Sequence, residues 1–248
     1  MRYIQEVSRY LDKLDRTQSD NIQSAAQAMA DAIRDGRQIF SFGASHSFIV
    51  TMEMVYRTGG LMLVNPIVPH GMNLDVRPMT MTSRIERIEG YGRVLMESSP
   101  AKKGDVIIIV STSGRNAVAL DMALAARDMG LVVIGITAMD YTRRVTSRHS
   151  SGKKLCELCD IVIDNCAPYG DSCSEISVVS AGVKIDGMAG PVSSITGIAI
   201  ANQLTVSVCD ILAAEGVEAP VFISANTDEG DAYNKALLER NKDRIHYI

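Results

Sequence analysis

The chain has 248 residues, of which 46% are hydrophobic and 22% charged, the balance of a folded globular protein rather than a disordered one. The formal net charge of −4 and the lack of any basic run argue against a nucleic-acid partner, because such proteins gather Lys and Arg on one face. Residues 1–15 lack a secretory signal, and no purely apolar stretch approaches the roughly 20 residues that span a bilayer, so we expect a cytoplasmic protein without a membrane partner.

The first predicted elements are two helices within residues 1–36, which we expect to pack on the domain or on a partner subunit. In the first helix, apolar residues recur at helical spacing along one face, namely Ile4, Val7, Leu11 and Leu14. The second covers residues 19–34 and ends at Asp35-Gly36, because glycine readily takes the left-handed conformation that ends a helix.

The rest of the chain alternates between short apolar strands and helices. Strands are expected at residues 38–42, 61–64, 105–110, 132–137 and 160–163. Helices are expected at residues 47–57, 84–97, 117–129, 155–158, 194–214 and 228–244. Continuous β-branched strands such as residues 105–110 are typical of a sheet that is buried on both faces. The order predicts an α/β fold, a doubly wound parallel sheet of about five strands flanked by helices, in a single domain over residues 1–248.

Five cysteines in a chain without a secretory signal make a disulfide framework unlikely. Cys156 and Cys159 form a C-x-x-C pair, and Cys166 and Cys173 could complete a four-thiolate zinc site. These last two are seven residues apart, whereas a structural zinc site needs a second close pair. We therefore interpret the cysteines as core thiols and expect no metal.

Two serine-rich loops follow predicted parallel strands. Gly43-Ala44-Ser45-His46-Ser47 follows the strand at 38–42, and Ser111-Thr112-Ser113-Gly114-Arg115-Asn116 follows the strand at 105–110. Hydroxyl groups and free N–H groups at the start of a helix favour anion binding. Any single serine there could be an ordinary helix cap, but two such loops at the ligand-binding edge of a parallel sheet favour a ligand.

Neither common nucleotide-binding motif is present. The dinucleotide fingerprint needs G-x-G-x-x-G, but Ser45 and Phe48 occupy the places of the later glycines, and no Walker A sequence occurs. A third serine-rich helix start, Ser193-Ser194-Ile195-Thr196, again favours an anionic ligand.

A Ser-x-Ser-Gly-x-Asn loop after an apolar strand, with a Gly-x-Ser-type loop one βα unit earlier, resembles the sugar isomerase (SIS) domain. The segment Leu155–Asp160 is similar to that family's short helix before a strand. The segments His149–Leu155 and Pro220–Asn226 resemble a bacterial family of single-SIS-domain proteins that is likened to phosphoheptose isomerase.

The resemblance implies a five-stranded parallel sheet and a homodimer or homotetramer with sites near subunit interfaces. It also implies that a sugar phosphate is the small-molecule ligand. Phosphate contacts would fall on Ser45, Ser47, Ser111, Ser113, Asn116, Ser194 and Thr196. His46 lies inside the first loop and would orient the anion.

Aldose–ketose isomerisation needs an acid/base group to open the sugar ring and a base to move a proton between neighbouring carbons. Glu53 is a candidate base, because related isomerases carry a base on the helix after the first serine loop, although a lone glutamate there could equally be a surface residue. Glu89 and Glu86 are further candidates, but their alternating-charge segment is more typical of a solvated helix face. His149 is favoured over His70 as the ring-opening group, since the unperturbed pKa of histidine is near 6.5.

The favoured interpretation is an enzyme that acts on a phosphorylated sugar or amino sugar, most simply as an isomerase. The alternative is a non-catalytic sugar-phosphate sensor, since SIS domains also serve as sensors in transcription factors. Other SIS domains are etherases, deaminases and deglycases. The fold alone does not name the reaction. No cofactor is expected, and the irregular segments 65–82 and 166–175 are expected to set sugar specificity.

Overall fold

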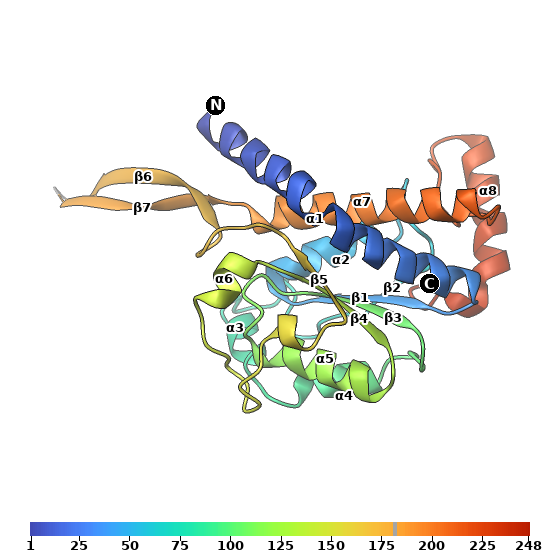
Figure 1. Cartoon of the computed structure of the whole chain (residues 1–248), viewed down its shortest axis with the longest axis horizontal. Helices are drawn as coiled ribbons and strands as arrows, with labels where there is room; N and C mark the ends of the chain where they lie inside the picture. Colours follow the sequence, from blue (N-terminus) through green and yellow to red (C-terminus); the bar gives the residue numbers. More distant parts are fainter. Residues whose placement is uncertain (181–182) are drawn as a thin grey trace.

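The computed structural model describes residues 1–180 and 183–248 and contains a sheet of five parallel strands in the order β2-β1-β3-β4-β5 (Figure 1). The strands are β1 (Ile39–Gly43), β2 (Val64–Pro66), β3 (Val106–Val110), β4 (Val132–Thr137) and β5 (Ile161–Asp164). The predicted doubly wound parallel sheet is therefore confirmed. Only β2 is displaced from its predicted range, because Leu61 instead forms an isolated antiparallel bridge with Val221.

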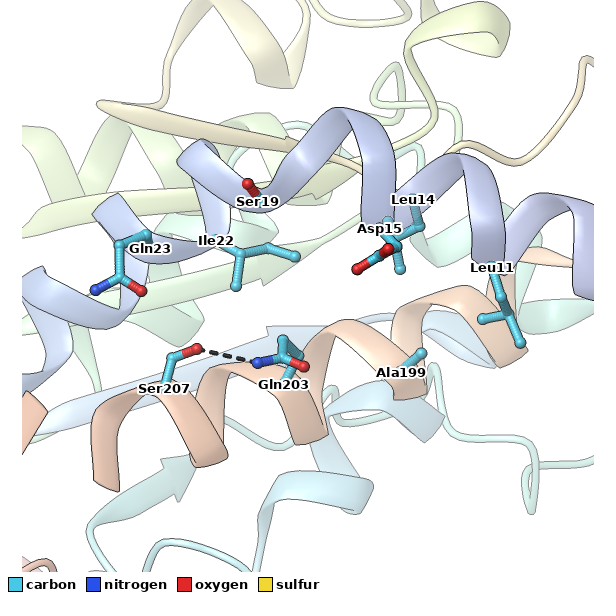
Figure 2. Close-up of a pocket in the computed structure, with 9 residues that line it drawn as sticks. All are labelled: Leu11, Leu14, Asp15, Ser19, Ile22, Gln23, Ala199, Gln203 and Ser207. Atoms are coloured by element: carbon cyan, nitrogen blue, oxygen red, sulfur yellow. Dashed lines mark hydrogen bonds between the residues drawn. The ribbon is translucent and has the colours of Figure 1, made fainter. Parts of the chain in front are cut away.

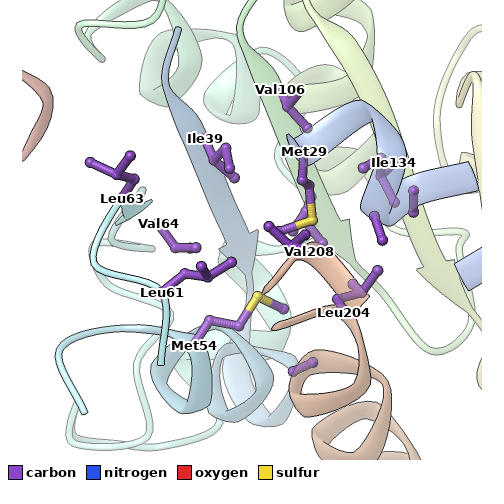
Figure 3. Close-up of a cluster of buried hydrophobic side chains, with 14 of the residues drawn as sticks. Met29, Ile39, Met54, Leu61, Leu63, Val64, Val106, Ile134, Leu204 and Val208 are labelled. Atoms are coloured by element: carbon purple, nitrogen blue, oxygen red, sulfur yellow. The ribbon is translucent and has the colours of Figure 1, made fainter. Parts of the chain in front are cut away.

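Helices cover both faces of the sheet (Figure 1). One layer contains α1 (Arg2–Arg34), α2 (Phe48–Met54) and α7 (Ser193–Ala214), and the other contains α4 (Tyr91–Glu97) and α5 (Ala117–Asp128). Successive strand side chains point to opposite faces, so Ile108 lies in the first apolar cluster and Ile107 in the second. Figure 3 shows the first cluster, in which Met29 of α1 meets Leu204 and Val208 of α7 beside the strands. Burial on both faces explains why the strands are continuously apolar.

The prediction of two N-terminal helices is wrong, because residues 2–34 form the single helix α1. Residues 16–20 contain neither glycine nor proline, so the backbone hydrogen bonding continues through the expected break. Leu14, Gln18 and Ile22 are all buried on the same helix. The packed face of α1 therefore extends across the polar segment that the sequence suggested as a boundary.

The prediction of a single helix over residues 84–97 is also wrong. That helix is replaced by α3 (Met81–Ile85) and α4, which are separated by Gly90 at a φ of 88°. The Gly90 N–H donates to the Asp121 carboxylate over 2.6 Å, which fixes the break. A further helix, α6 (Met139–Arg143), forms where the sequence predicts none, and its first N–H donates to Asp164 over 2.9 Å.

Two long strands that the sequence did not predict form an antiparallel hairpin, β6 (Ser172–Ser180) and β7 (Val183–Pro191). The hairpin projects from the body beside the start of α1 (Figure 1). Tyr3 secures its base, since the phenol donates to the Pro191 carbonyl over 2.6 Å and the ring lies against Gly190. The predicted loop at 166–175 thus leads into a two-stranded ribbon, on which Ile176 and Met188 are exposed.

The C-terminal half of the chain adds α7 and α8 (Asp228–Asn241). Among the described residues, α7 is the one helix whose length and apolar composition would allow it to cross a membrane. It packs against α1 and α2 in this structure, in agreement with its predicted place in the core.

Candidate functional site

The two serine loops lie side by side at the carboxyl edge of the sheet. Strands β1 and β3 are neighbours, and their final residues pair as Gly43 with Val110. The chain runs outward from β1 to β2 on one side and continues from β3 to β4 on the other. Such a topological switch point leaves a crevice in which α/β proteins of this strand order bind their ligands.

The first loop turns tightly out of β1. A side chain at Gly43 would place its Cβ 2.5 Å from the backbone of Ser47, so only glycine allows this close approach. Ser45 adopts a φ of 52°, and its N–H donates to the Met72 carbonyl over 2.9 Å. Residues Ser45–Ser47 form a short 3-10 helix that leads into α2, and His46 is exposed on it.

The second loop is held by the neighbouring strand and helix. Gly114 has a φ of 61°, and a Cβ there would lie 2.9 Å from the Thr137 hydroxyl. The Thr142 hydroxyl donates to the Ser113 carbonyl over 3.0 Å. The half-buried hydroxyls of Ser111 and Ser113 make no hydrogen bond to any residue that the structure describes, so they remain available to a ligand.

Glu86 joins the two loops. One oxygen of its carboxylate accepts a hydrogen bond from the Ser45 hydroxyl, and the other accepts from the Asn116 side-chain amide over 2.7 Å. The Glu86 carbonyl also accepts from the Val118 N–H at the start of α5 over 3.1 Å. A carboxylate therefore lies at the junction of the predicted phosphate loops.

Sequence reasoning placed Glu86 on a solvated helix face, because it assumed one helix over 84–97. The helix α3 ends at Ile85, so Glu86 leaves the regular helix and reaches the loops instead. The clue available in the sequence was Gly90, which favours a break at this point.

His149 and Glu89 lie together in a separate network beside these loops. His149 Nε2 lies 3.1 Å from the Asp121 carboxylate, and only 9% of the His149 side chain is exposed. Glu89 accepts from both the Ser150 hydroxyl, over 2.6 Å, and the Ser150 N–H, over 2.7 Å. The hydroxyl bond is the main reason that the pKa of Glu89 is lowered. These contacts fasten the segment after α6 to α5 and to the turn between α3 and α4.

Glu53 lies on a different part of the molecule surface. Its carboxylate accepts from Asn202 on α7 over 2.9 Å and also pairs with Arg57. The structure therefore places Glu53 at the contact between α2 and α7, without a hydrogen bond to the serines of either loop within the described residues.

The third serine-rich helix start is already occupied by a carboxylate. Asp171 accepts from both the N–H and the hydroxyl of Ser193, over 2.7 and 2.6 Å. Thr196 is fully buried, and its hydroxyl bonds to backbone carbonyls of the preceding turn. Ser194 is half-buried beside them. We therefore centre the candidate site on the first two loops.

A groove of about 310 Å³ lies between α1 and α7 (Figure 2). Leu11, Leu14 and Ile22 of α1 line it opposite Gln203 and Ser207 of α7. The residues that line it include Asp15 but no Lys or Arg, so it offers a phosphate no positive partner.

The cysteines give no sign of a metal centre. No group of three or more His, Cys, Asp or Glu side chains in the described part of the chain is arranged to hold an ion. Burial raises the pKa of Cys159 to about 12, as is usual for a thiol in apolar surroundings.

The fold and the two loops define a class of protein, an α/β protein with serine-rich loops at the switch point of a parallel sheet. The SIS domain family matches residues 2–138, which include both loops. A UPF0309 protein of Shouchella clausii is 44% identical over 247 residues, covering 100% of this chain and 98% of the relative. A UPF0309 protein of Streptomyces coelicolor is 38% identical over 231 residues, covering 93% and 90%. The chain therefore belongs to the SIS domain family, and its relatives are UPF0309 proteins.

Solved structures show the same fold at low sequence identity. The phosphoheptose isomerase of Neisseria gonorrhoeae aligns with a TM-score of 0.53 and 16% identity, over 84% of this chain and 95% of that one. The phosphoheptose isomerase of Francisella tularensis aligns with a TM-score of 0.54 and 14% identity, over 83% and 94%. Both alignments show that this chain shares the overall fold of these proteins.

Proposed function

We propose that this single-domain protein binds a phosphorylated sugar or amino sugar at the two serine loops in the cytoplasm. We further propose that it catalyses aldose–ketose isomerisation or a related acid/base reaction. The observation that supports this proposal most directly is the Glu86 carboxylate, which joins Ser45 of one loop to Asn116 of the other. A phosphate bound at these loops would lie next to a carboxylate able to transfer protons.

The phosphate would be held by hydroxyl and N–H groups. Ser47, Ser111 and Ser113 offer hydroxyls that no described residue engages, and such donors form short bonds to phosphate oxygens. Ser45 and Asn116 hold Glu86 and would lie between the phosphate and the reacting carbons. Binding of the phosphate would thus place the rest of the sugar within reach of Glu86.

Glu86 is the proposed base for moving a proton between neighbouring sugar carbons. Proton transfer by a positioned carboxylate needs hydrogen-bond reach to the reacting group. We favour Glu86 because it bonds to both serine loops, whereas Glu53 and Glu89 bond to neither within the described residues. His149 remains the predicted ring-opening group, with Asp121 orienting its ring. The names of the structural neighbours, both phosphoheptose isomerases, support an isomerase more than the alternative of a non-catalytic sensor.

We predict that Ser113→Ala abolishes stabilisation by sugar phosphates in a thermal-shift assay. A ligand at 100 times its Kd stabilises by about 2.7 kcal/mol, which raises the Tm of a protein of this size by about 5–10 °C. The panel would contain hexose, heptose and amino-sugar phosphates. Ser24→Ala is the matched control, because Ser24 is exposed on α1 and bonds only within that helix. If no phosphate shifts the parent Tm, or if Ser113→Ala responds like the parent, the proposed site is wrong.

We also propose that the protein is a homodimer or homotetramer in which the β6–β7 hairpin and the start of α1 contact a second copy. Both project from the body (Figure 1), and they expose Ile4, Ile176 and Met188. Large apolar side chains on a projecting ribbon are typical of an interface.

We predict that the double substitution Ile176→Glu and Met188→Glu dissociates the oligomer into smaller species. Light scattering should then give a lower molar mass than for the parent. Buried charges without partners would destabilise the contact. Lys235→Glu is the control, because Lys235 is exposed on α8, far from the ribbon (Figure 1). A parent that is monomeric at all concentrations would refute the interface.

A further inference from the structure

Three arginines gather beside the junction of the serine loops. The Arg148 guanidinium donates to the Asn116 side-chain oxygen over 2.9 Å, and the Arg148 N–H donates to the Arg115 carbonyl over 2.9 Å. Reduced hydration, followed by repulsion from Arg115 and Arg87, lowers the pKa of Arg148. Arg115 and Arg87 therefore add positive charge to the surroundings of Arg148.

No carboxylate forms an ion pair with these arginines in the described part of the chain, although the charge of the nearby Glu86 partly opposes the lowering of the Arg148 pKa. Within residues 1–180 and 183–248, none of the three guanidinium groups has a carboxylate oxygen within 4.0 Å. Both oxygens of Glu86 are bonded to Ser45 and Asn116. Arg115 contacts the Thr146 hydroxyl only at 3.5 Å, and its Nε is buried without a partner. Buried donors normally have partners, so this nitrogen requires an explanation.

The cluster lies on one side of the proposed phosphate site. Arg115 belongs to the loop after β3, and Arg148 belongs to the segment after β4, whereas Ser45 follows β1. The strand order β1-β3-β4 sets these three positions side by side along one edge of the sheet. With about 4.8 Å between neighbouring strands, the edge from β1 to β4 measures about 10 Å, roughly the length of a hexose with acidic groups at both ends.

We propose that the ligand carries a second anionic group in addition to its phosphate, and that Arg115 and Arg148 bind that group. The second group is either a carboxylate or another phosphate, both of which match the fork of an arginine side chain. The inference rests on the proposed sugar-phosphate function and narrows its substrate class to doubly acidic sugars.

The test compares matched pairs of ligands by calorimetry. 6-Phosphogluconate against glucose 6-phosphate tests a carboxylate, and fructose 1,6-bisphosphate against fructose 6-phosphate tests a second phosphate. We expect the parent to bind at least one doubly acidic sugar with a Kd about tenfold or more lower than that of the singly acidic sugar in the same pair. Arg115→Gln should remove most of this difference in affinity, which is the advantage of the second acidic group. The pair that shows the advantage identifies the second group.

Two further variants test whether the effect is specific to Arg115 and to the shape of its guanidinium group. Arg143→Gln removes an exposed charge from α6 and should leave the advantage unchanged. Arg115→Lys keeps the charge but loses the planar fork, so it should retain only part of the advantage, and it serves if Arg115→Gln fails to fold.

Other outcomes overturn the inference in distinguishable ways. If singly and doubly acidic sugars bind equally and Ser113→Ala still abolishes binding, this inference fails and the proposed function stands. If Arg115→Gln weakens both members of a pair equally, the arginine serves the one phosphate and the inference also fails. If no sugar phosphate binds, both proposals fail together.

Discussion

Replacing Glu86 with glutamine is expected to lower the turnover of a sugar phosphate by about 10²–10⁴, the usual contribution of a general acid/base group. Glutamine keeps the size of the side chain and an oxygen that can accept from Ser45 or Asn116, but it cannot take up a proton. Calorimetry should therefore show a Kd close to that of the parent, while a coupled or NMR assay of isomerisation shows the loss of kcat.

Parallel variants decide which carboxylate acts. Glu53→Gln, Glu89→Gln and His149→Gln test the candidates that the sequence suggests, and Glu97→Gln is a control because Glu97 is exposed and paired with Arg93 on α4. If Glu53→Gln loses turnover and Glu86→Gln does not, the base lies on α2 and Glu86 only joins the loops.

Replacing Ile108 with alanine should destabilise the fold by about 2–5 kcal/mol, as expected for a fully buried aliphatic side chain. Ile108 is 0% exposed in the middle of β3 and faces the α1–α7 layer. Each kcal/mol should lower the Tm by about 2–4 °C in a chain of this length, measured by circular dichroism or calorimetry.

The comparison variant for Ile108 is Ile88→Ala, because Ile88 is 52% exposed between α3 and α4. Its effect should stay within about 0.5 kcal/mol. A loss at Ile108 no larger than the loss at Ile88 would show that the sheet relaxes around the cavity, contrary to the close packing described here.

The central sheet and its two serine loops were predictable because strong local patterns specify them. Residues 105–110 form an unbroken apolar run, and only a strand covered on both faces accommodates such a run. The loops were recognisable because small and hydroxyl residues follow these strands directly. A Cβ atom at Gly43 or Gly114 would come too close to neighbouring atoms, so these positions favour glycine. The glycines in the sequence therefore also indicate the two turns.

The parts that escaped prediction depend on contacts between distant segments. Glu86 contacts Ser45 across 41 positions of sequence, and no local pattern around Glu86 indicates that contact. The continuity of α1 depends on its packing against α7, whereas the polar residues near Ser19 suggest an end. The first strand of the hairpin, β6, contains four serines and no sustained alternation of apolar and polar residues, so its sequence does not indicate a strand.

The pairing of Gly43 with Val110 has a consequence for how the protein diverges from its relatives. Backbone hydrogen bonds between β1 and β3 fix the spacing of the two loops, so exchange of core side chains leaves that spacing almost unchanged. Under the proposed function, ligand preference would then be set by the connections that surround this fixed anchor, such as residues 67–80 and 144–154. These two connections are the first places to redesign when the protein is to be redirected to a different sugar.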